Sequence, residues 1–200
     1  MAQKVEKETA RNLMIIPGNV RGTVILADAE YIRQKLGNQG LKLTEKRLRE
    51  LGCPFLFDEI KPMEYYPEAF SVLVILLARE LLDLDDEGVF EMGKSGLKHS
   101  FFVRILTKYF LSAKRCFEES PTYWKKHFDF GTVETVKFDE QKRSAVFRVK
   151  GYKFHPIMCI YHEGYFQQIA QMAIGKKDVT IEETKCVFKG EPYHEYIIRW

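Results

Sequence analysis

The sequence predicts an α+β fold in which N-terminal helices pack on a four-stranded, mainly antiparallel sheet. Two observations carry this prediction. Apolar residues recur at helical spacing up to about residue 128, and from Gly131 onward they alternate with polar residues as in strands. One helix then interrupts the strands, so the C-terminal part reads as a β-β-α-β-β unit. Helices and strands that are separated along the chain are typical of α+β proteins.

The N-terminal part reads as a succession of helices. They are predicted over 26–36, 45–51, 67–82, 86–92, 97–112 and 121–128. Gly37 and Gly52 end the first two, and Thr44 is the expected N-cap of the second. The helix that opens at Pro67 is apolar on most sides, which predicts a central core helix and, if its face exceeds the core, a dimer element.

The C-terminal part begins with a hairpin and ends with another. Alternation over 133–138 and 145–154 predicts two paired strands, and a helix follows over 157–174. Strands are then predicted over 179–188 and 193–200, with a turn at 189–192 between them.

Composition excludes several classes of protein. The chain of 200 residues suits one domain, predicted over residues 20–200 after an N-terminal extension of residues 1–19. A net charge of +3 is too small and too evenly spread for nucleic-acid binding, and no apolar run approaches the ~20 residues of a membrane span. Four cysteines at irregular spacing predict reduced thiols in a cytoplasmic protein.

Potential metal ligands gather near the C-terminus. They are Cys159, Glu183, Cys186 and His194. Cys186 and His194 flank a turn, so paired strands can bring them together, whereas an ideal strand places Glu183 and Cys186 on opposite faces. Joint ligation therefore requires a bulge or a strand end between Glu183 and Cys186. The alternative is two buried free cysteines and an exposed His194.

The same segment resembles the 4-vinyl reductase domain family. The matching residues are Cys159, Gly164-Tyr165, Glu183-x-x-Cys186, Gly190 and His194. That family includes the ligand-binding input domains of phenol-sensing regulators and is related in fold to haem nitric-oxide-binding domains and to transport-particle (TRAPP) subunits. Its metal-binding members hold a structural zinc at these positions, and His194 replaces a final cysteine with another legitimate zinc ligand. The resemblance therefore implies a zinc cofactor, and it covers about residues 20–200.

The resemblance also implies a cavity between the helices and the sheet that holds a small apolar or aromatic ligand, or a tetrapyrrole. The candidate lining is Phe101, Phe102, Ile105, Leu106, Tyr109, Phe110, Trp124, Phe128, Phe147 and Tyr165. Aromatic stripes at helical spacing are equally typical of a plain core. Haem is disfavoured, because no Tyr-x-Ser-x-Arg run occurs and only His99 and His127 suggest axial ligands.

No catalytic motif stands in a suitable context, so the chain is not expected to be an enzyme. The main prediction is a stand-alone bacterial-type sensory domain that binds a small apolar or aromatic molecule and signals in trans to a protein partner, as a homodimer. The alternative is a non-catalytic, dimeric scaffold or assembly subunit with a TRAPP-like fold. A haem or tetrapyrrole binder is the third reading.

Overall fold

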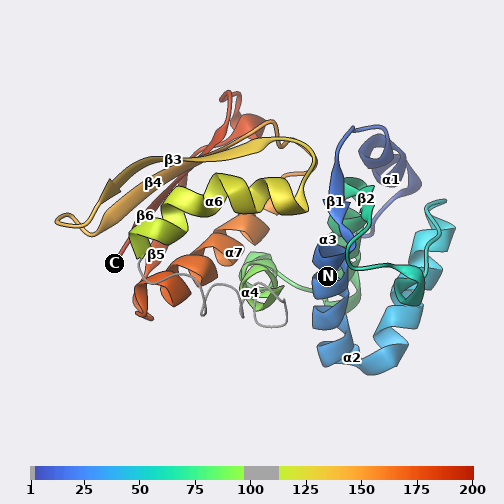
Figure 1. Cartoon of the computed structure of the whole chain (residues 1–200). Coiled ribbons are helices and arrows are strands. Elements are labelled where there is room, and N and C mark those ends of the chain that lie inside the picture. Colours follow the sequence, from blue (N-terminus) through green and yellow to red (C-terminus); the bar gives the residue numbers. More distant parts are fainter. Residues whose placement is uncertain (1–2, 97–112) are drawn as a thin grey trace.

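The computed structural model describes residues 3–96 and 113–200, and it confirms the α+β class. The N-terminal elements are α1 (Lys7–Met14), β1 (Asn19–Arg21), α2 (Gly22–Glu50), the 3₁₀ turn η1 (Phe57–Glu59), β2 (Tyr65–Pro67), α3 (Glu68–Leu82) and α4 (Asp86–Gly96). The C-terminal elements are α6 (Ala113–His127), β3 (Thr132–Asp139), β4 (Ser144–Lys150), α7 (Ile157–Ile174), β5 (Thr180–Lys185), the 3₁₀ turn η2 (Val187–Lys189) and β6 (His194–Arg199). Figure 1 shows α1, α2 and α3 with β1 and β2 at one end of the molecule, the sheet with α6 and α7 at the other, and α4 between them beside α7.

The larger sheet has the strand order β3-β4-β6-β5, and all its pairs are antiparallel. Helix α7 connects β4 to the edge strand β5, and β6 then returns between them, which gives the predicted β-β-α-β-β unit. Helix α6 lies along β3, α7 lies along β5, and the two helices contact each other. The side chains of Ala145, Phe147 and Val149 on β4 are buried, as the alternation predicted.

Helix α2 runs through the two helices that the sequence predicted separately. Its 29 residues contain a kink at Gly37, where φ is 65° and ψ is −164°, a conformation that suits glycine. Thr44 is not an N-cap, because it lies inside the second half of the helix and its hydroxyl donates to the Gly40 carbonyl. The glycine therefore redirects the helix, and no loop follows it.

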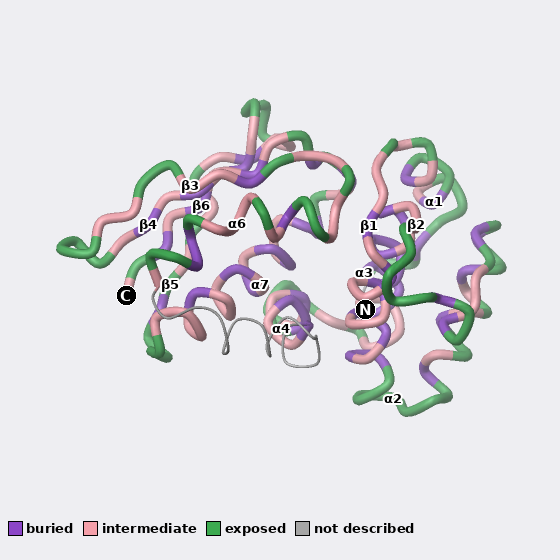
Figure 2. The backbone as a smooth tube through the Cα atoms, in the orientation of Figure 1, coloured by how far each residue is buried: buried purple, intermediate pink, exposed green. Residues whose placement is uncertain are grey.

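Helix α3 is the central core helix that its apolar sequence predicted. Residues 71–78 are all buried, and Figure 2 shows α3 among the buried segments while much of the second half of α2 is exposed. The condition for a dimer face on α3, an apolar face larger than the core covers, is not met, because the chain itself buries residues 71–78, and a homodimer stays a prediction. Among the helices of residues 3–96 and 113–200, none combines the length and apolarity needed to cross a membrane.

Helices α4 and α7 pack backbone against backbone. A Cβ atom on Gly164 would lie 1.9 Å from the Phe90 carbonyl oxygen, and one on Gly93 would lie 2.1 Å from the Tyr161 carbonyl oxygen. Only glycine at both positions permits this approach. The contact joins α4 of the N-terminal part to α7 of the C-terminal part, and it gives Gly164 of the family resemblance a packing role.

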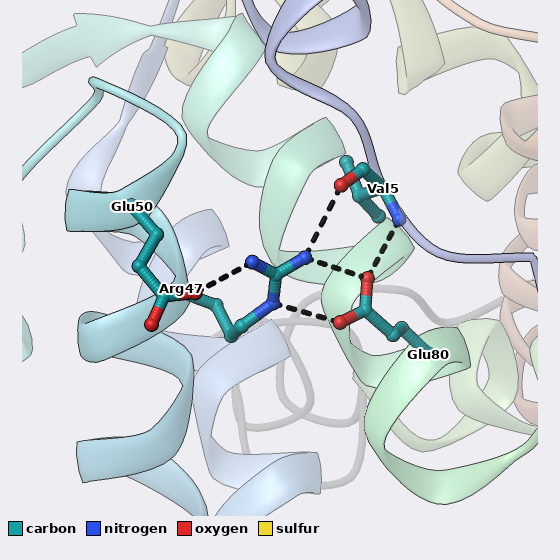
Figure 3. A network of polar contacts seen from close by, with 4 residues as sticks. All are labelled: Val5, Arg47, Glu50 and Glu80. Atoms are coloured by element: carbon teal, nitrogen blue, oxygen red, sulfur yellow. Dashed lines mark hydrogen bonds and ion pairs between the residues drawn. The ribbon is translucent and has the colours of Figure 1, made fainter.

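An ion-pair network fastens the N-terminal segment to the helices (Figure 3). Arg47 donates to both carboxylate oxygens of Glu80, at 2.8 and 3.2 Å, and also pairs with Glu50 at 2.7 Å. The Val5 backbone completes the network, since its N–H donates to Glu80 and its carbonyl accepts from Arg47. Val5 and Leu13 are buried, so this segment belongs to the packed structure; the proposed boundary at residue 19 stays a prediction.

Candidate ligand cavity and metal centre

A cavity of about 390 Å³ lies where the N-terminal elements meet α6, α7 and the sheet. Its N-terminal wall comes from β1, the first turns of α2 and α3, and the end of α4. Its C-terminal wall comes from α6, α7 and the inner side of the sheet. The wall is mostly apolar, which is typical of sites for small organic ligands.

Four of the ten predicted lining residues lie in this wall. They are Trp124, Phe128, Phe147 and Tyr165. The other six, Phe101, Phe102, Ile105, Leu106, Tyr109 and Phe110, fall outside the described residues.

The aromatic wall is held in place by ring contacts. Trp124 stacks on Phe128 with ring centroids 4.1 Å apart, and its indole N–H donates to the Phe130 carbonyl. Phe147 meets Phe166 edge to face at 4.5 Å. Rings fixed in this way form a preorganised apolar surface.

Two buried acids, which the sequence analysis did not identify, stand beside the cavity. Asp28 on α2 accepts hydrogen bonds from Tyr161 at 2.5 Å and from Ser71 at 2.8 Å. Glu68, the first residue of α3, accepts one from Tyr152 at 2.5 Å. Burial raises the pKa of Asp28 to about 7 and that of Glu68 to about 8, although the hydrogen bonds oppose the shift. Helical periodicity gives no signal for such polar residues.

Histidines and basic side chains also line the cavity. Burial lowers the pKa of His162 to about 3 and that of His127 to about 4, so both rings are neutral at pH 7. His162 is packed among aromatic rings, including Tyr152 at 4.7 Å. Arg21 and Lys126 add positive charge to the wall, and both lie over tyrosine rings.

The predicted metal ligands come together in one cluster. One donor atom from each of Cys159, Glu183, Cys186 and His194 lies within 4.8 Å of all the others. The Cys159 sulfur lies 3.4 Å from the Cys186 sulfur and 3.9 Å from His194 Nδ1, and this nitrogen lies 2.7 Å from Glu183 Oε1. Both cysteines are free thiols, and His194 is only 2% exposed, contrary to the alternative of an exposed ring.

A strand irregularity brings Glu183 and Cys186 to the same side. The pairing of β5 with β6 shifts register between Glu183 and Lys185, and β5 ends at Lys185. The sequence analysis required a bulge or a strand end at this place, and both are present.

The orientation of His194 suits metal ligation. Its Nε2 lies 3.0 Å from the Tyr152 carbonyl oxygen and therefore donates to it, which leaves Nδ1 facing the cluster, where it can ligate a cation. Burial raises the pKa of Cys159, and nearby Glu183 raises it further. Electron-pair donors that face one another in a buried space favour a cation between them.

The comparisons with known proteins identify the fold. The sequence matches no known family profile and no curated protein. Solved structures do match, including an H-NOX protein from S. oneidensis in the Fe(II)NO ligation state, with a TM-score of 0.64, 14% identity, and coverage of 90% of this chain and 98% of that one. The chain has the H-NOX fold. An oxygen-binding H-NOX domain related to soluble guanylate cyclases matches with a TM-score of 0.64, 13% identity, and coverage of 90% of this chain and 94% of that one.

Another H-NOX structure, from work on haem distortion in that family, matches with a TM-score of 0.63, 14% identity, and coverage of 90% of this chain and 94% of that one. The expectation that haem is disfavoured is therefore wrong. It relied on a missing sequence run, whereas the chain adopts a fold found in haem proteins and places two neutral histidines in its cavity. The comparisons give no support to zinc or to the 4-vinyl reductase family in particular, while the implied relation to the haem nitric-oxide-binding fold is confirmed.

Proposed function

We propose that this chain is a non-catalytic sensory domain that binds a ligand in the cavity between its N-terminal helices and its sheet. The observation that carries the proposal is the cavity itself, with an apolar wall and a few polar side chains, in a chain with the H-NOX fold. A ligand that stabilises one of two conformations of the domain would shift their populations. That the change is transmitted to a protein partner stays a prediction. That the chain forms a homodimer also stays a prediction.

Haem is the first ligand candidate, and the cavity side chains fit it. His162 and His127 carry the neutral imidazole that ligates haem iron, and Arg21 and Lys126 can neutralise carboxylate substituents. Bound haem would supply an iron atom able to bind diatomic gases. The chain would hold the iron through an imidazole, exclude bulk water with its aromatic wall, and orient the group by charge.

Reconstitution with haem tests this candidate. We expect the purified chain to take up about one haem, measured by absorbance and total haem, with an imidazole-type spectrum. His162→Ala or His127→Ala should change that spectrum. His155→Ala is the matched control, because His155 accepts a hydrogen bond from the Ile157 N–H and lies outside the cavity wall. A wild-type chain that takes up no haem rules this candidate out.

A small, mainly apolar molecule is the second candidate for the same cavity. A volume of about 390 Å³ falls in the range of sites for drug-sized ligands, roughly 300–1,000 Å³. Native mass spectrometry of the chain as purified separates the candidates, because haem, a small organic molecule and a metal ion add different masses. A chain that carries no guest and binds none of the added aromatic compounds contradicts the sensory proposal.

We also propose that Cys159, Glu183, Cys186 and His194 hold one metal cation that stabilises the C-terminal unit. The support is the convergence of four buried or half-buried donors from α7, β5, the residue that follows β5, and β6, with His194 oriented by the Tyr152 carbonyl. The proposal concerns the ligand set and leaves the element to the measurement.

Elemental analysis with a divalent-metal titration tests the ligand set. His194→Ala and Cys186→Ser should each lose the bound metal and melt at a lower temperature, because metal binding and folding are coupled. Cys53→Ser is the control, since this buried cysteine lies in the N-terminal part, away from the cluster. The proposal is contradicted if the wild type and the three variants hold equal amounts of metal, or if the wild type holds none after titration.

A further inference from the structure

Two positively charged side chains of the cavity wall have no carboxylate partner. Arg21 ends β1 and Lys126 lies in the last turn of α6, and the first is partly exposed while the second is exposed. The ion pairs of residues 3–96 and 113–200 involve neither of them. Residues 1–2 and 97–112 contain no Asp or Glu, so the chain has no other side-chain carboxylate to offer them.

The pairing of β1 with the end of α6 brings the two cations together. Val20 forms an antiparallel bridge with Phe128. The next step of that pairing places Arg21 beside His127, the last residue of α6, and the Arg21 Nε donates to the Lys126 carbonyl oxygen at 3.3 Å. Burial lowers the pKa of His127 to about 4, and the positive charges of Arg21 and Lys126 contribute to the shift, so both cations lie near this imidazole.

Both charged groups lie beside residues of the cavity wall. The Arg21 guanidinium donates through Nη1 to the carbonyl of Met63, which lines the cavity, and lies 4.0 Å from the ring centroid of Tyr65. The Lys126 ammonium lies 4.7 Å from the ring centroid of Tyr123, another lining residue. Among the described residues, the Arg21 hydrogen bonds use Nε and Nη1, and Nη2 keeps its donors.

The acids beside the cavity do not offset these charges. Asp28 accepts hydrogen bonds from Tyr161 and Ser71, and Glu68 accepts one from Tyr152. In the part of the chain that the structure describes, neither acid forms an ion pair with a basic side chain. The charge that a guest meets where the cavity reaches solvent is therefore positive.

We propose that Arg21 and Lys126 form a cationic rim that selects carboxylate-bearing molecules with an apolar, aromatic body for this cavity. The proposal rests on the proposed function, because it requires the cavity to accept a small molecule, and it names the class of that molecule. The carboxylate accepts hydrogen bonds from Arg21 Nη2 and from the Lys126 ammonium, and such charge-assisted bonds are stronger than neutral ones. The aromatic body lies against the stacked rings of Trp124 and Phe128.

Calorimetric titration of the full, haem-free chain at low ionic strength tests the cationic rim. The probes are 3-phenylpropionate, 3-phenylpropionamide, 3-phenylpropylamine and acetate. We expect the phenylpropionate to bind about tenfold more tightly than the amide of the same shape, since hydrogen bonds from charged donors are worth about that factor. The amine should bind more weakly than the amide, and acetate should show no measurable binding because it lacks the apolar body.

The salt dependence of binding separates charge from shape. Because the rim is partly exposed, added salt screens its charges, and in about 0.5 M sodium chloride the preference for the acid over the amide should fall to about threefold or less. The affinity for the neutral amide should not fall.

Variants assign the preference to the rim. Lys126→Gln should weaken the phenylpropionate about fivefold and leave the amide unchanged, a loss within the range of a partly exposed ion pair. Lys126→Glu should favour the amine over the acid. Lys125→Gln is the matched control, because this lysine is the exposed neighbour on the same helix but lies outside the cavity wall, and it should leave the preference unchanged. Arg21→Gln should act as Lys126→Gln does, with its melting temperature measured because Arg21 also holds two backbone carbonyls.

Each outcome decides the proposal. Equal affinities for the acid and the amide in the wild type overturn the rim and leave the cavity as a site for neutral molecules. A preference that is unchanged in both Lys126 variants also overturns it. Acetate that binds as tightly as phenylpropionate shows an anion site independent of the cavity and overturns it as well. A folded wild-type chain that binds no probe contradicts the small-molecule function, and the rim with it.

Discussion

The buried acids predict that the chain loses stability as the pH rises above neutrality. The pKa is about 8 for Glu68 and about 7 for Asp28 in the folded chain, against ordinary values of 4.5 and 3.8. The folded state therefore holds protons that the unfolded state has released. This contribution to stability is fully present below the ordinary values and is lost as the pH rises through about 7 and 8.

The magnitude follows from these pKa values. Between pH 7 and pH 8.5 Glu68 loses most of its proton and Asp28 loses the remaining half of its own, so the free energy of unfolding should fall by about 1–2 kcal/mol. Most of this change belongs to Glu68. The low pKa values of His162 and His127 act in the opposite sense, and only as the pH falls through about 6.5, outside this window.

Urea denaturation at pH 7, 7.75 and 8.5 measures how steeply the free energy of unfolding falls with pH, which is the slope that these pKa values predict. A chelator is present so that metal binding does not contribute. Glu68→Gln should flatten it by roughly three quarters, because Gln does not titrate. Asp28→Asn should flatten it less. A slope in Glu68→Gln equal to that of the wild type would refute the argument that burial keeps this carboxyl protonated.

Other substitutions test the packing and the polar contacts, each by the urea midpoint. Gly164→Ala should cost about 1–3 kcal/mol or more, because its Cβ meets the α4 backbone, whereas a Cβ on Gly88 meets only side-chain atoms of Leu84 and Asp85, so Gly88→Ala costs less. Arg47→Met should cost about 1–3 kcal/mol by leaving its half-buried carboxylate partner unpaired, while Arg33→Met at an exposed pair should change nothing measurable. Tyr161→Phe should cost about 1–2 kcal/mol by removing a buried hydrogen bond to Asp28. If Arg47→Met lowers the free energy of unfolding no more than Arg33→Met does, the ion-pair network of Arg47 contributes nothing to stability.

The C-terminal unit could be predicted from the sequence because its signals are local. Alternation predicted the first hairpin, two β-rich runs about a turn predicted the second, and that turn brings His194 close to Cys186. The need for an irregularity after Glu183 followed from strand geometry alone, and the register shift confirms it. The N-terminal part was less predictable, because Gly37 permits a kink as well as an end, and only tertiary packing decides between them.

The buried acids beside the cavity could not be predicted. Glu68 opens α3 and Asp28 stands in the second turn of α2, and a polar residue at either place is ordinary and carries no sign of burial. They become buried because segments distant in the sequence close over them. For example, the Tyr152 hydroxyl that reaches Glu68 comes from a residue 84 positions away. Non-local contacts of this kind leave no periodic trace in the chain.

Tyr152 links the two candidate sites. Its carbonyl oxygen accepts from Nε2 of His194 in the metal cluster, and its hydroxyl donates to Glu68 in the cavity wall. Its ring is 1% exposed, so a shift at either end has little room to relax. We therefore expect metal loading to change the affinity for a small aromatic ligand of the cavity by fivefold or more, and the ligand to change metal affinity by the same factor.

Calorimetric titration of 4-ethylphenol into the metal-free and the metal-loaded chain measures this coupling. Tyr152→Phe keeps the carbonyl that orients His194 but removes the hydroxyl, so it should retain the metal and lose most of the coupling. Tyr193→Phe, at a half-buried ring of the β5–β6 turn, is the control and should retain both. Coupling that persists in Tyr152→Phe would show that it runs through the packed α7 helix, which carries Cys159 of the cluster and Tyr161 of the Asp28 hydrogen bond, rather than through Tyr152.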